Sequence, residues 1–334
     1  MSAKAEKLGY LSSLDLLRGL AAVAVCFFHF THGNKEFLSE SNFLYISGRV
    51  GFLGVDVFFV ISGFVIPYAM YRGNYHIRDF GRFLTKRVVR IEPPYLVSIA
   101  MVLALNWIST LSPAYRGAAF AINWPALGLH FGYLNAFFNY PWVNDVYWTL
   151  AIEFQYYLLI AMIFPLLVHT VKRYAYGVLL LGAVMSLFIN EHSLILNYSI
   201  LFIVGILLFQ FHIGYLKKKE FGSCLLIALI LLYVKFDNRY LAAALLPYFF
   251  ITYFEFHGRI SKFLGNISYS LYLVHIPIGG RIINLCENFV QNEMVRSLFV
   301  FVALGISIFA AWLFFIIIEK PFMALSKRIT YNKT

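Results

Sequence analysis

Charged side chains are scarce in this chain: 13% of its 334 residues are charged, whereas 61% are hydrophobic. An ordinary soluble domain carries about 25% charged residues, so the composition excludes that class. Cysteine is also rare, and Cys26, Cys224 and Cys286 all lie in or at the end of apolar runs, which argues against a disulfide framework and a thiolate metal site. The N-terminus lacks a short apolar segment followed by a cleavage site of small residues. We therefore predict no metal site and no signal peptide.

Apolar runs long enough to cross a bilayer as helices recur along nearly the whole sequence. They predict an all-α, polytopic membrane helix bundle of about ten transmembrane helices, forming a single domain over residues 1–334. Short tails are expected at 1–11 and 319–334. The segment 113–146 is apolar but broken by proline, glycine and asparagine, and we interpret it as an extracytoplasmic loop, either re-entrant or not. The predicted spans are 12–32, 50–70, 93–112, 147–168, 174–190, 194–212, 221–236, 240–256, 264–285 and 297–318.

Lysine and arginine indicate the orientation of the chain. Most of the 27 such residues fall in predicted loops on the side of the N-terminus. Cytoplasmic loops are enriched in these residues, so both termini are predicted to be cytoplasmic. We attribute the net charge of +11 to this sidedness and to contact with anionic membrane lipids. No basic segment interleaved with aromatic residues supports a nucleic-acid partner, and none is predicted.

Two ionisable residues in the apolar run of the first span, Arg18 and His29, lie eleven positions apart. At about 100° per residue, this spacing puts both on one helix face with a rise of about 16 Å, Arg18 toward the cytoplasm and His29 toward the outside. Asp56 and Glu153 are expected at the depth of His29, where a carboxylate would support an imidazole that acts as a general base. Plainer interpretations stay open for each residue alone: packing for the histidine, snorkelling for Arg18 and helix capping for Asp56.

Basic residues concentrate just before the third predicted span, in the stretch RDFGRFLTKRVVRIEPPYL. Such a cluster suits anionic lipid headgroups. Guanidinium groups also bind phosphates bidentately, so the second interpretation is a phosphate-bearing cosubstrate at the inner mouth of the bundle, with Arg18 continuing the same path. The five residues of the cluster are Arg78, Arg82, Lys86, Arg87 and Arg90.

The ninth span contains FLGNISYSLYLVHIP, with His275 near the middle of the membrane. Its hydroxyl groups either bond across helices as structural contacts or border a cavity together with His275. We take Tyr269 and His275, with Trp148 at the start of the fourth span, as candidate substrate-binding residues. The aromatic residues of 113–146 fit either stacking on sugar rings or an aromatic belt at the membrane interface.

Five segments in order resemble the membrane acyltransferase 3 family. They are LDLLRG from residue 14, with ten residues between Arg18 and His29; GVDVFFVISGF at 54–64; RVVRIEPPYL at 87–96; WTLAIEFQYYL at 148–158; and ISYSLYLVHIP at 267–277. Pro94 beside Pro93 departs from the family, which commonly has one proline there. The similarity covers essentially the whole chain.

The resemblance implies a multi-pass protein of the bacterial inner (cytoplasmic) membrane. Such proteins move an acyl group, usually acetyl, from acyl-coenzyme A to a sugar hydroxyl of a surface glycan. It further implies that His29 is catalytic and that Arg18, Arg87 and Arg90 bind the acyl donor, a set that we extend to Arg82 and Lys86. The acceptor is then a glycan or a lipid-linked sugar.

We expect His29 to remove the hydroxyl proton as that oxygen attacks the thioester carbonyl, with Glu153 or Asp56 supporting the imidazolium. A covalent acyl-histidine is the competing route. From another class, a transporter or lipid-linked glycan flippase also uses buried Arg, His and carboxylate groups, although the chain shows no half-to-half repeat. A non-catalytic sensor on the same scaffold is a third alternative. Acyl length, acceptor sugar and oligomeric state, with an oligomer compatible, are left open by the sequence.

Overall fold

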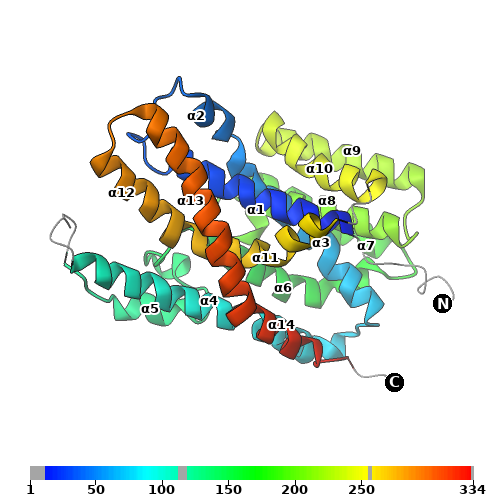
Figure 1. The fold of residues 1–334 in the computed structure, drawn as a ribbon. Helices are drawn as coiled ribbons and strands as arrows, with labels where there is room; N and C mark the ends of the chain where they lie inside the picture. The colour runs from blue at the N-terminus through cyan, green and yellow to red at the C-terminus, as the bar shows by residue number, and fades with distance from the viewer. Residues whose placement is uncertain (1–11, 112–118, 255–257, 332–334) are drawn as a thin grey trace.

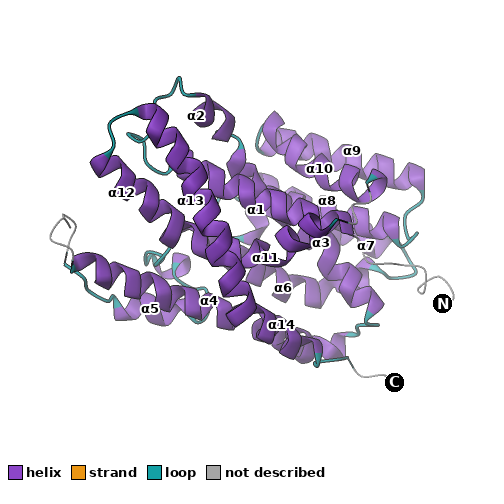
Figure 2. Ribbon diagram, in the orientation of Figure 1, coloured by secondary structure: helices purple, strands orange, loops and turns teal. Residues whose placement is uncertain are grey.

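The computed structural model describes residues 12–111, 119–254 and 258–331, and every regular element in these ranges is a helix (Figure 2). Four predicted segments lie partly or wholly outside the described residues: the tail at 1–11, the end of the third span with the start of the predicted loop at 112–118, the last residues of the eighth span, and the end of the tail at 332–334. The longer helices are α1 (Ser12–His32), α3 (Gly54–Arg72), α4 (Phe80–Thr110), α6 (Trp148–Leu167), α7 (Arg173–Phe188), α8 (Ile195–His212), α9 (Lys218–Lys235), α10 (Asn238–Tyr253), α11 (Arg259–His275) and α13 (Glu293–Phe314). The shorter ones are α2 (Phe43–Gly48), α5 (Trp124–His130), α12 (Arg281–Phe289) and α14 (Lys320–Lys327).

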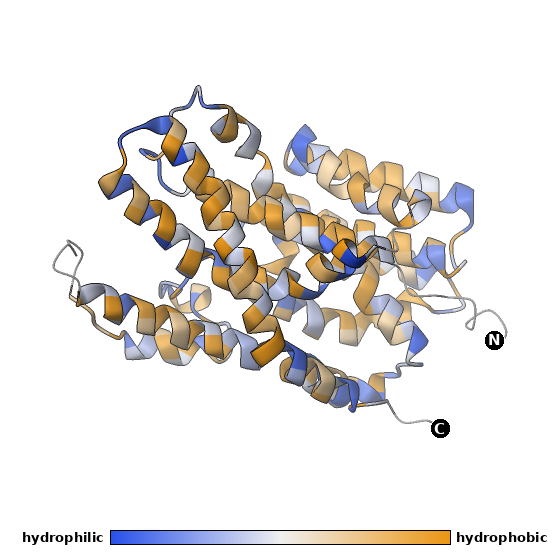
Figure 3. Ribbon diagram, in the orientation of Figure 1, coloured by the Kyte–Doolittle hydropathy of each residue, from blue (hydrophilic) through white to orange (hydrophobic). Residues whose placement is uncertain are grey.

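Six helical stretches of the described residues are long and apolar enough to cross a membrane. By this criterion the structure supports a multi-pass membrane protein but does not reach the ten crossings expected from the sequence. The other four predicted spans correspond to α7, α9, α10 and the run from α11 through α12. In Figure 3, hydrophobic residues predominate along the helices, as expected of helices that contact lipid. The six stretches are Ser12–His32, Phe43–Arg72, Ile77–Thr110, Asp145–Leu167, Ile195–His212 and Glu293–Lys327.

The third predicted span is longer than expected. It was placed at 93–112, but α4 begins at Phe80 and continues through Pro93 and Pro94. Proline is tolerated within membrane helices because neighbouring groups satisfy the freed backbone carbonyls. Four residues of the basic cluster therefore lie on α4, where residues three and four apart share a face, and Arg78 lies in the preceding turn η2 (Ile77–Asp79).

Two further helical segments follow α13. After α13, a π-helical turn, η6 (Phe315–Glu319), leads into α14, which packs against α4. The segment expected as a tail from residue 319 thus begins with a buried carboxyl group, because Glu319 is 2% exposed.

The segment between α4 and α6 folds back onto α4. It contains α5 and two short turns, η3 (Ala136–Phe138) and η4 (Asp145–Tyr147). His130 is fully buried, and its Nδ1 lies 2.7 Å from the hydroxyl of Tyr95 on α4. The Tyr133 hydroxyl donates a 2.8 Å hydrogen bond to Glu92. The described part of the predicted loop is therefore anchored against the middle of a long apolar helix.

The helices run roughly between two ends of the molecule. In Figure 1, α2, α5 and α12 lie toward the left, whereas the start of α1 lies toward the right and the connection from α3 to α4 and α14 lie toward the lower right. Helices α3 and α8 touch through glycine: a Cβ at Gly205 would lie 2.1 Å from the carbonyl oxygen of Val60, and one at Gly63 would lie 2.2 Å from that of Phe202. Small residues of this kind allow membrane helices to approach closely.

Candidate functional site

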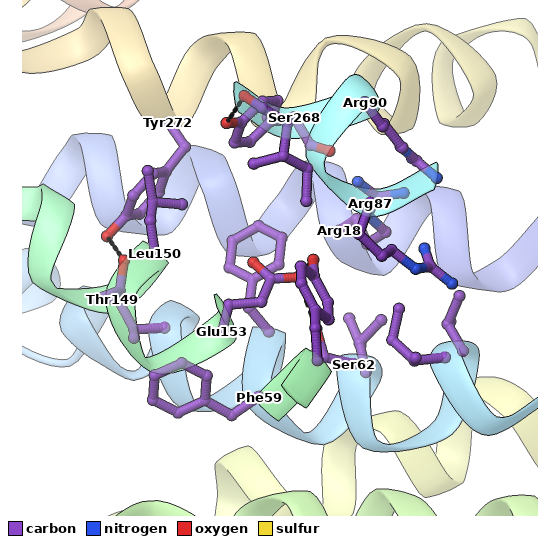
Figure 4. A pocket seen from close by; sticks show the side chains of 18 of the residues that line it. Arg18, Phe59, Ser62, Arg87, Arg90, Thr149, Leu150, Glu153, Ser268 and Tyr272 are labelled. Atoms are coloured by element: carbon purple, nitrogen blue, oxygen red, sulfur yellow. Dashed lines mark hydrogen bonds between the residues drawn. The ribbon is translucent and has the colours of Figure 1, made fainter. Parts of the chain in front are cut away.

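A cavity of about 130 Å³ lies between α1, α3, α4, α6, α11 and η6 (Figure 4). The two ends of this cavity differ in chemistry. Arg18, Arg87 and Arg90 gather at one end, and Thr149 and Tyr272 lie at the other. Apolar side chains of α3, α4 and α6 line much of the remaining wall.

Two residues of the basic cluster on α4 line the cavity, and the contacts of the others direct them away from it. Arg87 and Arg90, three positions apart, line it on one helix face. Arg82 is directed elsewhere, with Nη1 3.8 Å from the Asp79 carboxylate. The Lys86 ammonium donates a 3.1 Å hydrogen bond to the carbonyl oxygen of Ile329. The structure thus brings Arg18, Arg87 and Arg90 together, and leaves Arg82 and Lys86 outside the cavity.

Of the three arginines, Arg87 gives the clearest indication of an anion-binding site. It is 7% exposed, and its guanidinium carbon lies 5.2 Å from the ring centroid of Phe83 and 5.6 Å from that of Tyr157. Its Nε is buried and has no hydrogen-bond partner within the part of the chain that the structure describes. A buried guanidinium with an unused donor is unfavourable unless an anion completes the site.

Glu153 faces this cavity from α6. Its Oε1 accepts a 2.5 Å hydrogen bond from the Tyr157 hydroxyl and a 3.3 Å hydrogen bond from Ser62. The carboxyl group also interacts electrostatically with Arg18 and Arg87. The structure therefore groups Glu153 with the arginines rather than with His29.

A second carboxyl group in the cavity, Glu319, was not singled out from the sequence. It accepts a 2.6 Å hydrogen bond from Ser270 and interacts electrostatically with Arg18 and Arg90. The π-helical turn η6 places it there, and such turns occur frequently at functional sites. A glutamate directly after the apolar run FIII was the available signal, but we had assigned it to a tail.

His29 lies beyond the cavity, next to a second histidine. The ring centroids of His29 and His275 are 5.2 Å apart. Nδ1 of the fully buried His275 lies 2.8 Å from the carbonyl oxygen of Tyr272, whereas its Nε2 has no partner among the described residues. Neither histidine belongs to the described cavity lining. The carboxylate that interacts electrostatically with His29 is Asp145, an exposed residue of η4.

The other predicted residues have separate surroundings. Asp56 is 5% exposed and lies near Tyr198 and Tyr240, outside the described cavity lining. The Trp148 ring packs against Tyr198, with centroids 5.6 Å apart. Tyr269 does line the cavity, and its hydroxyl donates a 3.0 Å hydrogen bond to the carbonyl oxygen of Ile91. The structure thus brings Tyr269 to the cavity and Asp56 and Trp148 to a neighbouring aromatic group.

Comparison with known proteins identifies the family to which the chain belongs. The profile of the acyltransferase domain of the acyltransferase 3 family matches residues 11–316. The O-acetyltransferase OatA of Staphylococcus aureus (strain NCTC 8325 / PS 47) is 33% identical over 172 residues, covering 49% of this chain and 26% of OatA. A putative O-acetyltransferase of Staphylococcus aureus (strain COL) is 27% identical over 370 residues, covering 96% of this chain and 58% of that protein. The chain therefore spans about a quarter to just over half of these relatives. No solved structure matches it.

Proposed function

Because the chain belongs to the acyltransferase 3 family, we propose that it is a membrane O-acetyltransferase that moves an acetyl group from cytosolic acetyl-coenzyme A to a sugar hydroxyl outside the membrane. The names of its relatives in Staphylococcus aureus support O-acetyl transfer as the chemistry. The acceptor that we propose is a glycan or lipid-linked sugar of a bacterial cell surface.

Arg87 carries the donor part of this proposal. Its buried Nε has an unused donor, and two further guanidinium groups, of Arg18 and Arg90, line the same end of the cavity. Guanidinium groups bind phosphate bidentately, and coenzyme A carries several phosphate groups. The apolar lining beyond the arginines suits the less polar arm that carries the thioester.

His29 is the residue that we propose as the general base. It removes the proton from the sugar hydroxyl as that oxygen attacks the thioester carbonyl. The tetrahedral intermediate then breaks its carbon–sulfur bond, and the imidazolium returns the proton to the departing thiolate. Asp145 stabilises the imidazolium, a role that the sequence suggested for Glu153 or Asp56. Glu153 accepts hydrogen bonds from Tyr157 and Ser62 and stabilises the guanidinium groups of Arg18 and Arg87.

We further propose ten crossings, with both termini cytoplasmic, in the inner membrane of a bacterium. The arrangement in Figure 1 supports this orientation, since the start of α1, the connection from α3 to α4 and α14 lie toward one end. Exposed aromatic residues of the α4–α6 segment, among them Trp124 and Phe131, are then available to a sugar or to the lipid interface.

Labelled acetyl-coenzyme A supplied to inverted membrane vesicles containing the chain tests the proposal. Wild-type vesicles are expected to transfer label to glycan. His29→Ala is expected to lose at least about a hundredfold in rate, the usual contribution of a general base, while it keeps its affinity for coenzyme A. The exposed His192 provides the matched control, His192→Ala, with unchanged transfer. Sugar transport without transfer of label would overturn the proposal in favour of a flippase, and label on His29 without acceptor would replace direct transfer by an acyl-histidine route.

A further inference from the structure

The cavity ends at a wall of three side chains opposite the arginines. Phe58 of α3, Thr149 of α6 and Tyr272 of α11 all line this end, and the rings of Phe58 and Tyr272 meet edge to face at 6.3 Å. Figure 4 shows Tyr272 and Thr149 joined by a hydrogen bond at the far end from Arg18 and Arg87. The wall therefore takes one side chain from each of three helices.

Tyr272 is the residue that joins the cavity to the histidines. Its ring centroid lies 5.7 Å from that of His275, which in turn lies 5.2 Å from that of His29. Tyr272 lines the described cavity, and the two histidines do not. Its side chain consequently borders the space that holds the arginines and also contacts His275, the neighbour of the imidazole that performs the proposed proton transfer.

Hydrogen bonds hold Tyr272 in this position. Its hydroxyl lies 2.6 Å from Thr149 Oγ1 and 3.1 Å from the carbonyl oxygen of Val146. Thr149 Oγ1 itself lies 3.0 Å from the same carbonyl oxygen, so these two groups remain paired when the tyrosine leaves. Displacement of Tyr272 thus breaks only the contacts of one ring and one hydroxyl.

On the basis of the proposed function, we propose that Tyr272 controls passage of the acyl group. The thioester reaches His29 only when the Tyr272 side chain leaves the wall formed with Phe58 and Thr149. In its closed position Tyr272 keeps water from the His29 side away from the thioester, and it interrupts a path that would otherwise cross the membrane. Tyr272 is a positioning residue in this reaction, since it takes no proton and forms no bond to the acyl group.

The thiol of a native cysteine, Cys26, can be used to measure opening of this wall without an assay of acetyl transfer. Cys26 of α1 is fully buried and free, and it belongs to the same buried cluster of side chains as Tyr272. We would replace Cys224 and Cys286 by serine, then measure the rate at which a charged, water-soluble methanethiosulfonate reagent modifies Cys26 in inverted vesicles. Loss of the Tyr272 hydroxyl bonds shifts the equilibrium between the closed and the displaced side chain by about tenfold. We therefore expect Cys26 to be modified about tenfold faster in Tyr272→Phe than in the wild type. Tyr272→Ala, which also removes the ring, is expected to react faster still.

Tyr75→Phe is the matched control. It removes a 2.8 Å hydrogen bond from a buried tyrosine to the carbonyl oxygen of Ala161, away from the described cavity lining. This control is expected to react at the wild-type rate, and Cys26→Ser should abolish the signal. The same Tyr272 variants are expected to hydrolyse acetyl-coenzyme A faster without acceptor, as water attacks the thioester carbonyl and releases acetate and the thiol.

Two outcomes overturn the proposal for Tyr272. One is a wild-type rate of Cys26 modification in Tyr272→Phe, which retains the ring and tests the proposal even if Tyr272→Ala does not fold. The other is an equal acceleration in Tyr75→Phe, which would indicate general loosening of the bundle. The thiol measurement does not depend on transfer, so a wild-type protein that fails to acetylate sugar refutes the proposed function and still reveals whether Tyr272 closes the cavity.

Discussion

Replacement of Arg87 by methionine should weaken donor binding without destabilising the free protein. The methionine side chain fills a similar apolar volume but offers no charge and no donor. A hydrogen bond to a charged group contributes about 1.5–3 kcal/mol. A loss of about 2 kcal/mol corresponds to about a thirtyfold increase in the Kd for coenzyme A.

The expected stability of the Arg87→Met variant has a different physical origin. Burial of one charge costs several kcal/mol, and in the free protein Arg87 recovers part of this through two ring contacts worth about 1 kcal/mol each and through Glu153. We therefore expect the thermal midpoint of the ligand-free variant to be equal to or above that of the wild type. A structural arginine would give the reverse pattern, with a lower midpoint and an unchanged Kd.

Isothermal titration of coenzyme A and thermal unfolding in the same detergent measure both quantities. Arg173→Met is the matched control, because it removes an exposed arginine at the start of α7, away from the described cavity lining, and should change neither. The reasoning is refuted if Arg87→Met lowers the midpoint while coenzyme A binds as tightly as before.

Three further changes probe other parts of the structure. Gly205→Ala should destabilise the protein by about 1–3 kcal/mol, because the added methyl group overpacks against the backbone of α3. Gly177→Ala, which has open space at its Cβ, should not destabilise it. Thermal unfolding compares the two variants, and equal midpoints would contradict the close contact between α3 and α8. Glu319→Gln should change the KM for acetyl-coenzyme A more than the kcat with a saturating donor, because Glu319 contacts the arginine end of the cavity; an effect confined to kcat would speak against this. Asp145→Asn should lower kcat with little effect on the Kd for coenzyme A, and unchanged transfer across pH 5–8 would remove Asp145 from the mechanism.

The sequence predicted the membrane class, the family motifs and the convergence of Arg18, Arg87 and Arg90. Arg87 and Arg90 came from the resemblance to the family, and helical periodicity agrees with it, because residues three apart share one face once the helix extends that far. Periodicity was not sufficient for Arg82 and Lys86. Lys86 lies four residues before Arg90 and would share its face, and only the tertiary contacts of Lys86 with the carbonyl oxygen of Ile329 and of Arg82 with Asp79 show that both are directed elsewhere.

The depth of a residue in the membrane predicted its neighbours at the site less well than the helix face on which it lies. Asp56 and Glu153 were expected beside His29 because each lies near the outer end of its helix. On α3, however, Val55, Phe58 and Ser62 face the cavity, and Asp56 is rotated about 100° from Val55 toward Tyr198. The rotation of a helix about its axis depends on its neighbours, and a single sequence does not contain that information.

The contact between Gly63 and Gly205 has a mechanical consequence. At these two glycines the backbones of α3 and the largely buried α8 are pressed together, and rings of both helices, such as Phe59 and Phe202, pack nearby, so the two helices are held against sliding along each other. The α3 wall of the cavity is therefore fixed to a rigid scaffold. We expect a motion that admits a bulky donor on the opposite side, where α4 and α11 meet through the hydroxyl bond of Tyr269 to the carbonyl oxygen of Ile91 and through ordinary side-chain packing.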